Sequence, residues 1–131
     1  MHADMVEVMR WGLNIGRLQE GAVTDFWQPE DVFRMATLDG ARALGLDGDI
    51  GSLATGKKAD LVVFDFRRAH LTPATDVLGN LVHVGQGRDV ETVIVDGRVV
   101  VEDGRAVLVD QDEVRLQAAE AARQLWIRAR G

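Results

Sequence analysis

The sequence predicts an α+β fold in which helices come first, a small β-sheet follows and one helix closes the chain. Apolar residues recur at helical spacing over residues ~4–19. Two Asp-Gly pairs separate alternating apolar runs between residues 92 and 109, a strong signal for consecutive hairpins. A capped amphipathic stretch follows from Asp110. Helices and strands are thus segregated along the chain, as in α+β folds or in pieces of two domains.

The predicted helical segment spans residues 1–45 and opens with a helix over residues ~4–19. Asp4 suits its N-cap, because the carboxylate can accept hydrogen bonds from the first free amides. One face of this helix is expected to be apolar, carrying Met5, Val8, Met9, Gly12, Ile15 and Gly16. Gly21 and residues 24–28 are predicted to form the loop that follows.

Two shorter helices complete this segment. Pro29 fits the first position of a helix, where its missing amide costs nothing, and acidic residues follow it in the first turn. The apolar contacts of that helix are expected from Val32, Phe33, Met35 and Ala36. Thr37 is predicted to cap a third helix ending at Gly45, because glycine adopts the left-handed conformation of a C-terminal cap without a steric penalty.

The predicted β-rich segment spans residues 46–109. Residues 59–64 form a strand with little polar interruption, and a long connection follows over residues 65–80. Residues 81–84 (Leu-Val-His-Val) are interpreted as a short β-like segment. The Asp-Gly pairs then join the strands of a β-meander, at residues 92–95, 99–102 and 106–109.

Residues 110–131 are predicted to form the closing helix. Asp110 is its N-cap, and Glu113 three residues later completes a capping-box-like pattern. An apolar stripe at helical spacing is made by Val114, Ala118, Ala121, Ala122, Leu125 and Ala129. Such a stripe predicts that this helix packs against another surface.

Composition and charge limit the classes of function. The 131 residues include 15 basic and 21 acidic ones, a net charge of −6, which argues against a nucleic-acid partner. There is no cysteine, so neither a disulfide nor a thiolate metal site can form. No apolar run approaches the ~18 residues of a membrane helix, and the first residues do not begin a secretory signal. The expected setting is cytoplasmic, without a membrane partner.

Three stretches carry a resemblance to a known family. They are ATLDGARALGL at residues 36–46, IGSLATGKKADLVVFD at 50–65 and DVETVIVDGRVVVEDG at 89–104. Together they resemble the C-terminal signature of metal-dependent amidohydrolases, in particular the cytosine-deaminase-like and chlorohydrolase-like branch. The resemblance implies the last helices of a (β/α)₈ barrel, the C-terminal half of a small β-sandwich and a terminal helix. A whole barrel needs about 250 residues, so the chain is expected to be a C-terminal fragment.

The same resemblance implies a hydrolase chemistry for a full-length parent. Family members cleave amide, amidine or ring C–N bonds, and some cleave C–Cl bonds. The attacking hydroxide forms on a divalent metal ion. For the parent, the resemblance implies zinc or iron and a heterocyclic or amidine substrate. The metal ligands lie on barrel strands. The three histidines here have no His-x-His spacing. We therefore predict no catalytic, cofactor-binding or metal-binding residue in this chain, and no activity for it in isolation.

Each histidine or lysine that could suggest a metal site has a simpler interpretation. His2 is expected to be a mobile terminal residue, and His70 a surface or packing residue. His83 is expected to be a hydrogen-bonded histidine of the sandwich. Lys57 and Lys58 invite comparison with a bridging carboxylated lysine, but they lie in a turn before a strand, where an exposed or interface position is expected.

The remaining polar and aromatic candidates are also given structural roles. Asp60 and Asp65 flank the first strand and are expected to bond to backbone amides. Trp11 and Trp27 are expected to pack between helices, although Trp27 could approach the substrate pocket of an intact enzyme. Trp126, beside the apolar stripe, is expected to anchor the last helix against the barrel or the sheet.

Two other functions stay open. The chain could be an assembly subunit that complements a separately encoded barrel, or a small enzyme of unrelated mechanism, for which no nucleophile–base pair is found. Residues 85–87 (Gly-Gln-Gly) lack the third glycine and the context of a phosphate loop. The expected partner is the remainder of an amidohydrolase barrel. Open sheet edges and uncovered apolar surface predict a homodimer, exchange of elements or aggregation.

Overall fold

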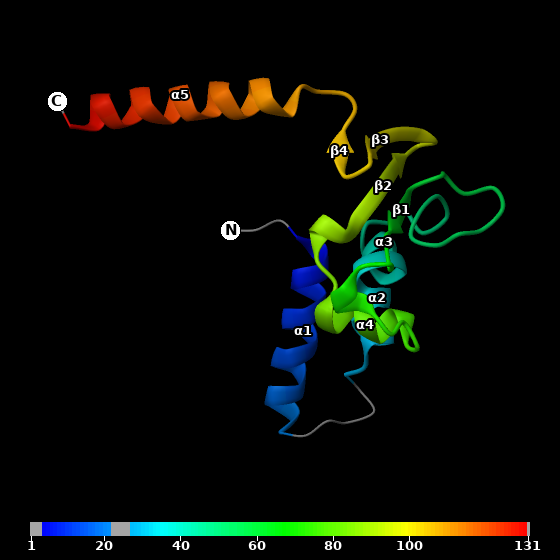
Figure 1. Cartoon of the computed structure of the whole chain (residues 1–131). Coiled ribbons are helices and arrows are strands. Elements are labelled where there is room, and N and C mark those ends of the chain that lie inside the picture. Colours follow the sequence, from blue (N-terminus) through cyan, green and yellow to red (C-terminus); the bar gives the residue numbers. More distant parts are fainter. Residues whose placement is uncertain (1–3, 22–26, 131) are drawn as a thin grey trace.

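Residues 4–21 and 27–130 are described by a computed structural model. Its elements are α1 (Met5–Glu20), α2 (Pro29–Arg34), the π-helix η1 (Met35–Asp39), α3 (Gly40–Ala43), β1 (Leu61–Phe64), the 3₁₀-helix η2 (Ala69–Leu71), α4 (Val77–Val84), the 3₁₀-helix η3 (Gly87–Asp89), β2 (Val90–Val95), β3 (Arg98–Glu102), β4 (Arg105–Ala106) and α5 (Gln111–Ala129). Figure 1 shows α1, α2 and α4 grouped together, the sheet at one end of this group, and α5 projecting from the sheet. Helices combined with an antiparallel sheet confirm the predicted α+β class.

Helix α1 begins and ends as its cap residues predict. The carboxylate of Asp4 accepts hydrogen bonds from the amides of Val6 at 2.9 Å and Glu7 at 3.4 Å. Gly21 follows the last turn with a left-handed φ of 70°, which glycine adopts without strain. Helices α1, α2 and α4 all contact one another.

The buried face of α1 differs from the predicted one. Met9 and Gly16 are buried as expected, but Met5, Val8 and Ile15 are 56%, 54% and 49% exposed. Helical spacing gives the width of an apolar stripe, whereas the positions of the neighbouring helices decide which part of it is covered. The buried core cluster consists of Val6, Met9, Leu13, Val32, Leu81 and Val82, drawn from α1, α2 and α4.

Helix α2 begins at Pro29, as predicted. The amide of Gln28 donates to Asp31 Oδ2 at 3.0 Å, half of a capping box. Of the predicted apolar contacts, Val32 is buried and Ala36 packs against the core, whereas Phe33 and Met35 are exposed. The residues predicted as the preceding loop lie partly outside the described ranges, because residues 22–26 are not described.

The predicted third helix is not separately capped. Helix α2 continues through the wider π-helical turn of η1 into α3, and Thr37 lies within that turn. Its hydroxyl donates to the carbonyl of Phe33 at 2.8 Å, so it satisfies a helical carbonyl rather than free amides. Gly45 has the left-handed φ of 71° predicted for the end of this helical run.

The sheet is a meander with strand order β1-β2-β3-β4, and each neighbouring pair is antiparallel. At both predicted Asp-Gly turns the aspartate has a φ of 50°, and the glycines that follow have φ of 78° and 71°. Positive φ at both central residues is the geometry of the predicted hairpins. The last strand is shorter than predicted: β4 pairs at two positions, and one more bond joins the Val107 amide to the Val100 carbonyl.

Residues 81–84, predicted as a β-like segment, belong instead to helix α4. Asp76 caps this helix, accepting a hydrogen bond from the Gly79 amide at 2.8 Å. Leu81 and Val82 are buried against the other helices. A short apolar run fits either a strand or a buried helix by periodicity alone, and here the cap five residues upstream decides between them.

Helix α5 begins at Asp110, whose carboxylate accepts hydrogen bonds from the amides of Asp112 at 2.9 Å and Glu113 at 3.1 Å. Every described residue of the helix is exposed, including the predicted stripe. Trp126, expected to be an anchor, is 64% exposed, so it anchors nothing within this chain. Among the helices of residues 4–21 and 27–130, none combines the length and apolar character that crossing a membrane requires.

Candidate functional site

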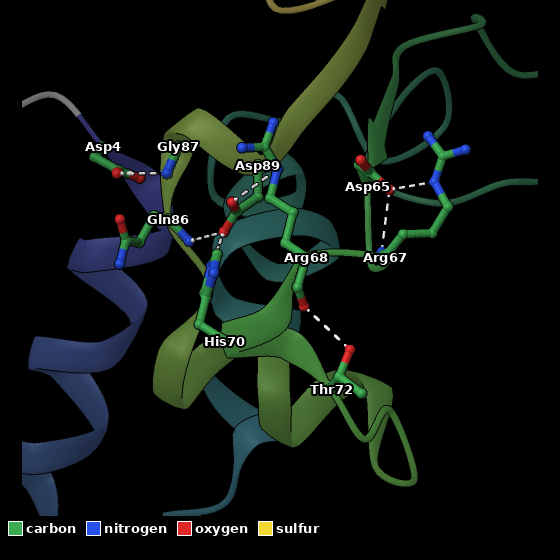
Figure 2. Close-up of polar contacts among 9 residues, drawn as sticks. All are labelled: Asp4, Asp65, Arg67, Arg68, His70, Thr72, Gln86, Gly87 and Asp89. Carbon is green, nitrogen blue, oxygen red and sulfur yellow. Dashed lines mark hydrogen bonds and ion pairs between the residues drawn. The ribbon is translucent and has the colours of Figure 1, made fainter.

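The most unusual polar group of the structure is the carboxylate of Asp89, which is completely buried. Its Oδ2 lies 2.8 Å from His70 Nε2 and accepts a hydrogen bond from the Gln86 amide at 2.9 Å. Its Oδ1 lies 3.3 Å from Arg68 Nε but has no partner with hydrogen-bond geometry. Figure 2 shows the three side chains converging where η2 and η3 approach one another.

The fold brings these groups together from separate elements. Arg68 and His70 lie at the start of η2, while Asp89 closes η3 and directly precedes β2. The carbonyl of Asp89 also accepts a hydrogen bond from the amide of Asp65 at 2.8 Å, just after β1 ends. Asp89 therefore joins both the 3₁₀ turn and the end of β1 to the start of β2.

A second set of bonds fixes α1 to the end of α4. Asp4 Oδ2 accepts a hydrogen bond from the Gly87 amide at 2.9 Å, in addition to its capping bonds (Figure 2). Arg10 Nε donates to the carbonyl of Val82 at 2.9 Å, and Arg10 Nη2 donates to that of Gly85. The guanidinium thus satisfies carbonyls in the last turn of α4, which lack partners within the helix. We call Asp4, Arg10, Arg68, His70 and Asp89 the joint cluster.

Lys57 organises the loop that precedes β1. Its Nζ donates to the carbonyls of Asp47 at 2.5 Å and Ile50 at 3.1 Å, and to the hydroxyl of Ser52 at 2.8 Å. These three acceptors use all the protons of the ammonium group. Lys57 is partly buried by this loop, and Lys58 is exposed with its Nζ 3.9 Å from Asp96 Oδ1. Lys58 is thus exposed, as expected, whereas Lys57 has a structural role inside the loop.

The two histidines in the described part of the chain lie on different elements, η2 and α4. His2 lies outside the described residues. His70, expected to be a surface or packing residue, is exposed and bonds to Asp89 as a member of the joint cluster. His83, predicted in a β segment, lies on α4 and is exposed.

The aspartates beside β1 bond to backbone amides, as predicted. Asp60 Oδ1 accepts from the amide of Asp96 at 2.6 Å, which ties the start of β1 to the first hairpin turn. Asp65 Oδ1 accepts from the side chain of Arg67 at 2.7 Å and from its amide at 3.1 Å. These bonds favour the ionised form, so they lower the pKa of the Asp65 carboxyl below its ordinary value.

The tryptophans on the helices differ in their environment. Trp27 packs against the core cluster, and its ring lies over Gly16 of α1 so closely that no side chain fits there. This confirms the packing role. The same residue also lines an open depression with Glu20 and Arg34. Trp11, expected to pack between helices, is 59% exposed, so this expectation is wrong.

The residues described by the structure do not fit a metal site. Over residues 4–21 and 27–130, no group of three or more side chains of His, Cys, Asp or Glu is placed to hold an ion. In the joint cluster, His70 Nε2 is already bonded to Asp89, and Arg68 supplies a positive charge beside it. Such an arrangement holds elements in place, because Asp89 links η2 to η3 through His70.

Sequence reasoning did not identify the joint cluster. Asp89 was used only as the start of a family-like stretch, and neither Arg10 nor Arg68 was singled out. One signal was present: Gln86 and Asp89 have the spacing of a capping box, which the structure contains. The other contacts join residues up to 83 positions apart, so a local pattern could not reveal them.

Known proteins resemble this chain over most of its length. The model of the Amidohydrolase family matches residues 2–100. A 5-methylthioadenosine/S-adenosylhomocysteine deaminase of Moorella thermoacetica is 49% identical over 86 residues, 66% of this chain and 20% of that protein. A protein of the same name from Pelotomaculum thermopropionicum is 40% identical over 125 residues, 93% of this chain and 28% of that protein. The 5'-deoxyadenosine deaminase of Methanosarcina acetivorans is 45% identical over 98 residues, 75% and 22% of the two chains.

Solved structures of other proteins also resemble this chain. An adenosine deaminase from Xanthomonas campestris with bound zinc has a TM-score of 0.85 and 28% identity, over 96% of this chain and 28% of that chain. An atrazine chlorohydrolase from Arthrobacter aurescens complexed with zinc has a TM-score of 0.78 over 88% of this chain and 25% of that chain; at 24% identity it supports the fold alone. The chain spans between a fifth and somewhat over a quarter of the length of these proteins.

Proposed function

Because the chain belongs to the amidohydrolase family, we propose that it forms the closing section of a deaminase-like enzyme and is inactive on its own. The observation that carries this proposal is the match of residues 2–100 to the family model. The joint cluster is consistent with a bracing role, because its bonds join α1 to α4 and η3, and η2 to η3.

The substrate that we propose for the intact enzyme is an adenosine-like nucleoside modified at its 5' position. The curated relatives named above are deaminases of 5-methylthioadenosine, S-adenosylhomocysteine and 5'-deoxyadenosine. In such a reaction water adds to the ring carbon that carries the amino group, the C–N bond breaks and ammonia leaves. The proton lost by the water is returned to the leaving nitrogen, so the reaction needs no oxidant or reductant.

A metal ion belongs to this proposal for the intact enzyme. Zinc is named with both solved relatives described above. A bound divalent metal would supply hydroxide near neutral pH. The described residues of this chain do not fit such a site, so their proposed contribution is to brace the structure that holds it. In this role the Asp4 and Arg10 contacts keep α1 at a fixed position relative to the sheet.

A segment exchange tests the proposal. The Pelotomaculum thermopropionicum relative suits it, because its alignment covers 93% of this chain. The aligned segment of that deaminase would be replaced by this chain. Deamination of 5'-methylthioadenosine by the chimera would then be measured by ultraviolet absorbance and by ammonia release. We expect the chimera to keep its kcat/KM within about tenfold of the parent, a loss of under about 1.4 kcal/mol. This chain alone should show no turnover with zinc or iron added.

Two controls make the result decisive. The parent lacking the segment is expected to be inactive, and adding this chain in trans tests whether it acts as a separate subunit. A folded chimera without activity would contradict the proposed role. Metal-dependent turnover by the isolated chain would contradict its proposed inactivity.

A further inference from the structure

We propose that α5 pairs antiparallel with α5 of a second copy of this chain. The helix has 19 residues, about 28 Å in length, and every one of its described residues is exposed. Figure 1 shows it projecting from the sheet, away from α1, α2 and α4. Isolated helices of this length are marginal in water, and most helices are stabilised by packing an apolar face. The helix therefore requires a partner surface.

The apolar stripe of α5 has the form that a two-fold antiparallel pair needs. Val114, Ala118, Ala121 and Leu125 follow one another at spacings of four, three and four, which places them on one face. When a second copy runs in the opposite direction, Val114 lies opposite Leu125 and Ala118 opposite Ala121. Val114 and Leu125, 53% and 68% exposed, can then pack on one another at each end, and the alanines between them allow the helices to approach closely.

The charges of α5 favour the antiparallel direction. Asp112 and Glu113 lie in its first turn, and Arg128 lies in its last turn, followed by Arg130. In an antiparallel pair the acidic end of each helix lies beside the basic end of the other, on both sides of the two-fold axis. In a parallel pair each end would face its own charge, which costs free energy. The helix dipoles are also opposed in the antiparallel pair, so charge complementarity identifies the second copy as the occupant.

Measurement of the mass of the full chain by light scattering tests the proposal. Over rising concentration, the mass should approach twice that of the monomer. Ala121→Glu should raise the dissociation constant at least about tenfold, because it places a carboxylate in the centre of the contact. The matched control Ala119→Glu adds the same charge off the stripe and should change it by less than about threefold. Both variants keep a good helix former, which circular dichroism checks.

Cross-linking tests the direction, since the chain has no cysteine of its own. Val114→Cys and Leu125→Cys proteins should form a disulfide when mixed and oxidised, and Val114→Cys alone should not. Self-cross-linking of Val114→Cys would overturn the antiparallel arrangement. A monomer at every concentration, or a dimer that Ala121→Glu leaves intact, would overturn the proposal itself. The monomer result would leave the remaining length of an amidohydrolase chain as the occupant of this face.

Discussion

The packing of Trp27 over Gly16 gives the sharpest test of the core. An ideal Cβ at Gly16 would lie 2.2 Å from Cδ2 of the indole ring and 2.3 Å from its Cε2. Carbon atoms pack best about 3.5–4.0 Å apart, so in Gly16→Ala the ring must retreat by more than about 1 Å. Overpacking of this kind costs about 1–3 kcal/mol. The higher helix propensity of alanine offsets at most about 1 kcal/mol of this destabilisation.

Gly12 in the same helix provides the matched control. A Cβ there would meet Val32 Cγ1 at 3.9 Å, which is ordinary contact. Gly12→Ala therefore receives the same gain in helix propensity without the clash and should stabilise the chain by about 0.5–1 kcal/mol. The free energies of unfolding of the two variants should differ by about 1–3 kcal/mol, with Gly16→Ala the less stable.

Urea unfolding measures this difference. Helical circular dichroism and tryptophan fluorescence should give coincident transitions, which supports the two-state treatment. At one fixed low concentration, self-association contributes equally to each variant. If Gly16→Ala proves as stable as Gly12→Ala, the indole ring does not lie over Gly16 and the described packing is wrong.

Three further predictions concern polar contacts. Asp89→Asn should cost about 2–3 kcal/mol in thermal or urea unfolding, because it removes a fully buried carboxylate from beside Arg68 and His70, whereas Asp65→Asn changes a more exposed carboxylate and should cost clearly less. Equal losses would contradict the role of burial. Arg10→Met should lower the free energy of unfolding by about 1.5–3 kcal/mol, because the carbonyls of Val82 and Gly85 lose their donor. Hydrogen exchange at the end of α4 should increase, and unchanged exchange there would refute the capping role. Hydrogen bonds from Arg34, and then from Arg42, lower the pKa of the Asp39 carboxyl in the folded chain. The ionised carboxylate therefore stabilises the fold at a pH above its unfolded pKa near 4, and this stabilisation is lost as the pH falls through the folded pKa. The melting temperature should therefore differ between wild type and Asp39→Asn at about pH 7 and converge at about pH 2, and a constant difference would argue against these bonds.

Local signals predicted the parts of the fold that local chemistry determines. The two Asp-Gly turns have the positive φ values that the sequence requires, because few residue pairs other than Asn-Gly, Asp-Gly and Gly-Gly favour them. The first and last helices begin after Asp4 and Asp110, whose side chains bond to nearby amides whatever the rest of the fold does. Each of these features depends on residues within a few positions of one another.

Features set by distant partners were predicted poorly. The apolar run at residues 81–84 became a helix because its side chains pack against α1, more than 60 positions away, and Asp76 caps it. The buried face of α1 shifted towards Val6 and Leu13 for the same reason. The carboxylate of Asp89 could not be identified as buried, because its partners His70 and Arg68 approach it only in the folded chain.

The bonds from α1 to the end of α4 also bear on the order in which the chain folds. Arg10 and Asp4 find their acceptor and donor 72 and 83 positions downstream, at Val82 and Gly87. Closing so long a loop costs conformational entropy before any contact forms to offset it. The β2-β3 hairpin closes a much shorter loop, because its strands are adjacent in the sequence. During synthesis the bonds that α1 makes to Val82 and Gly87 form only after these residues have left the ribosome, later than its contacts with Val32 of α2. Pulse-labelled hydrogen exchange during refolding should accordingly register protection in β2 and β3 before α1.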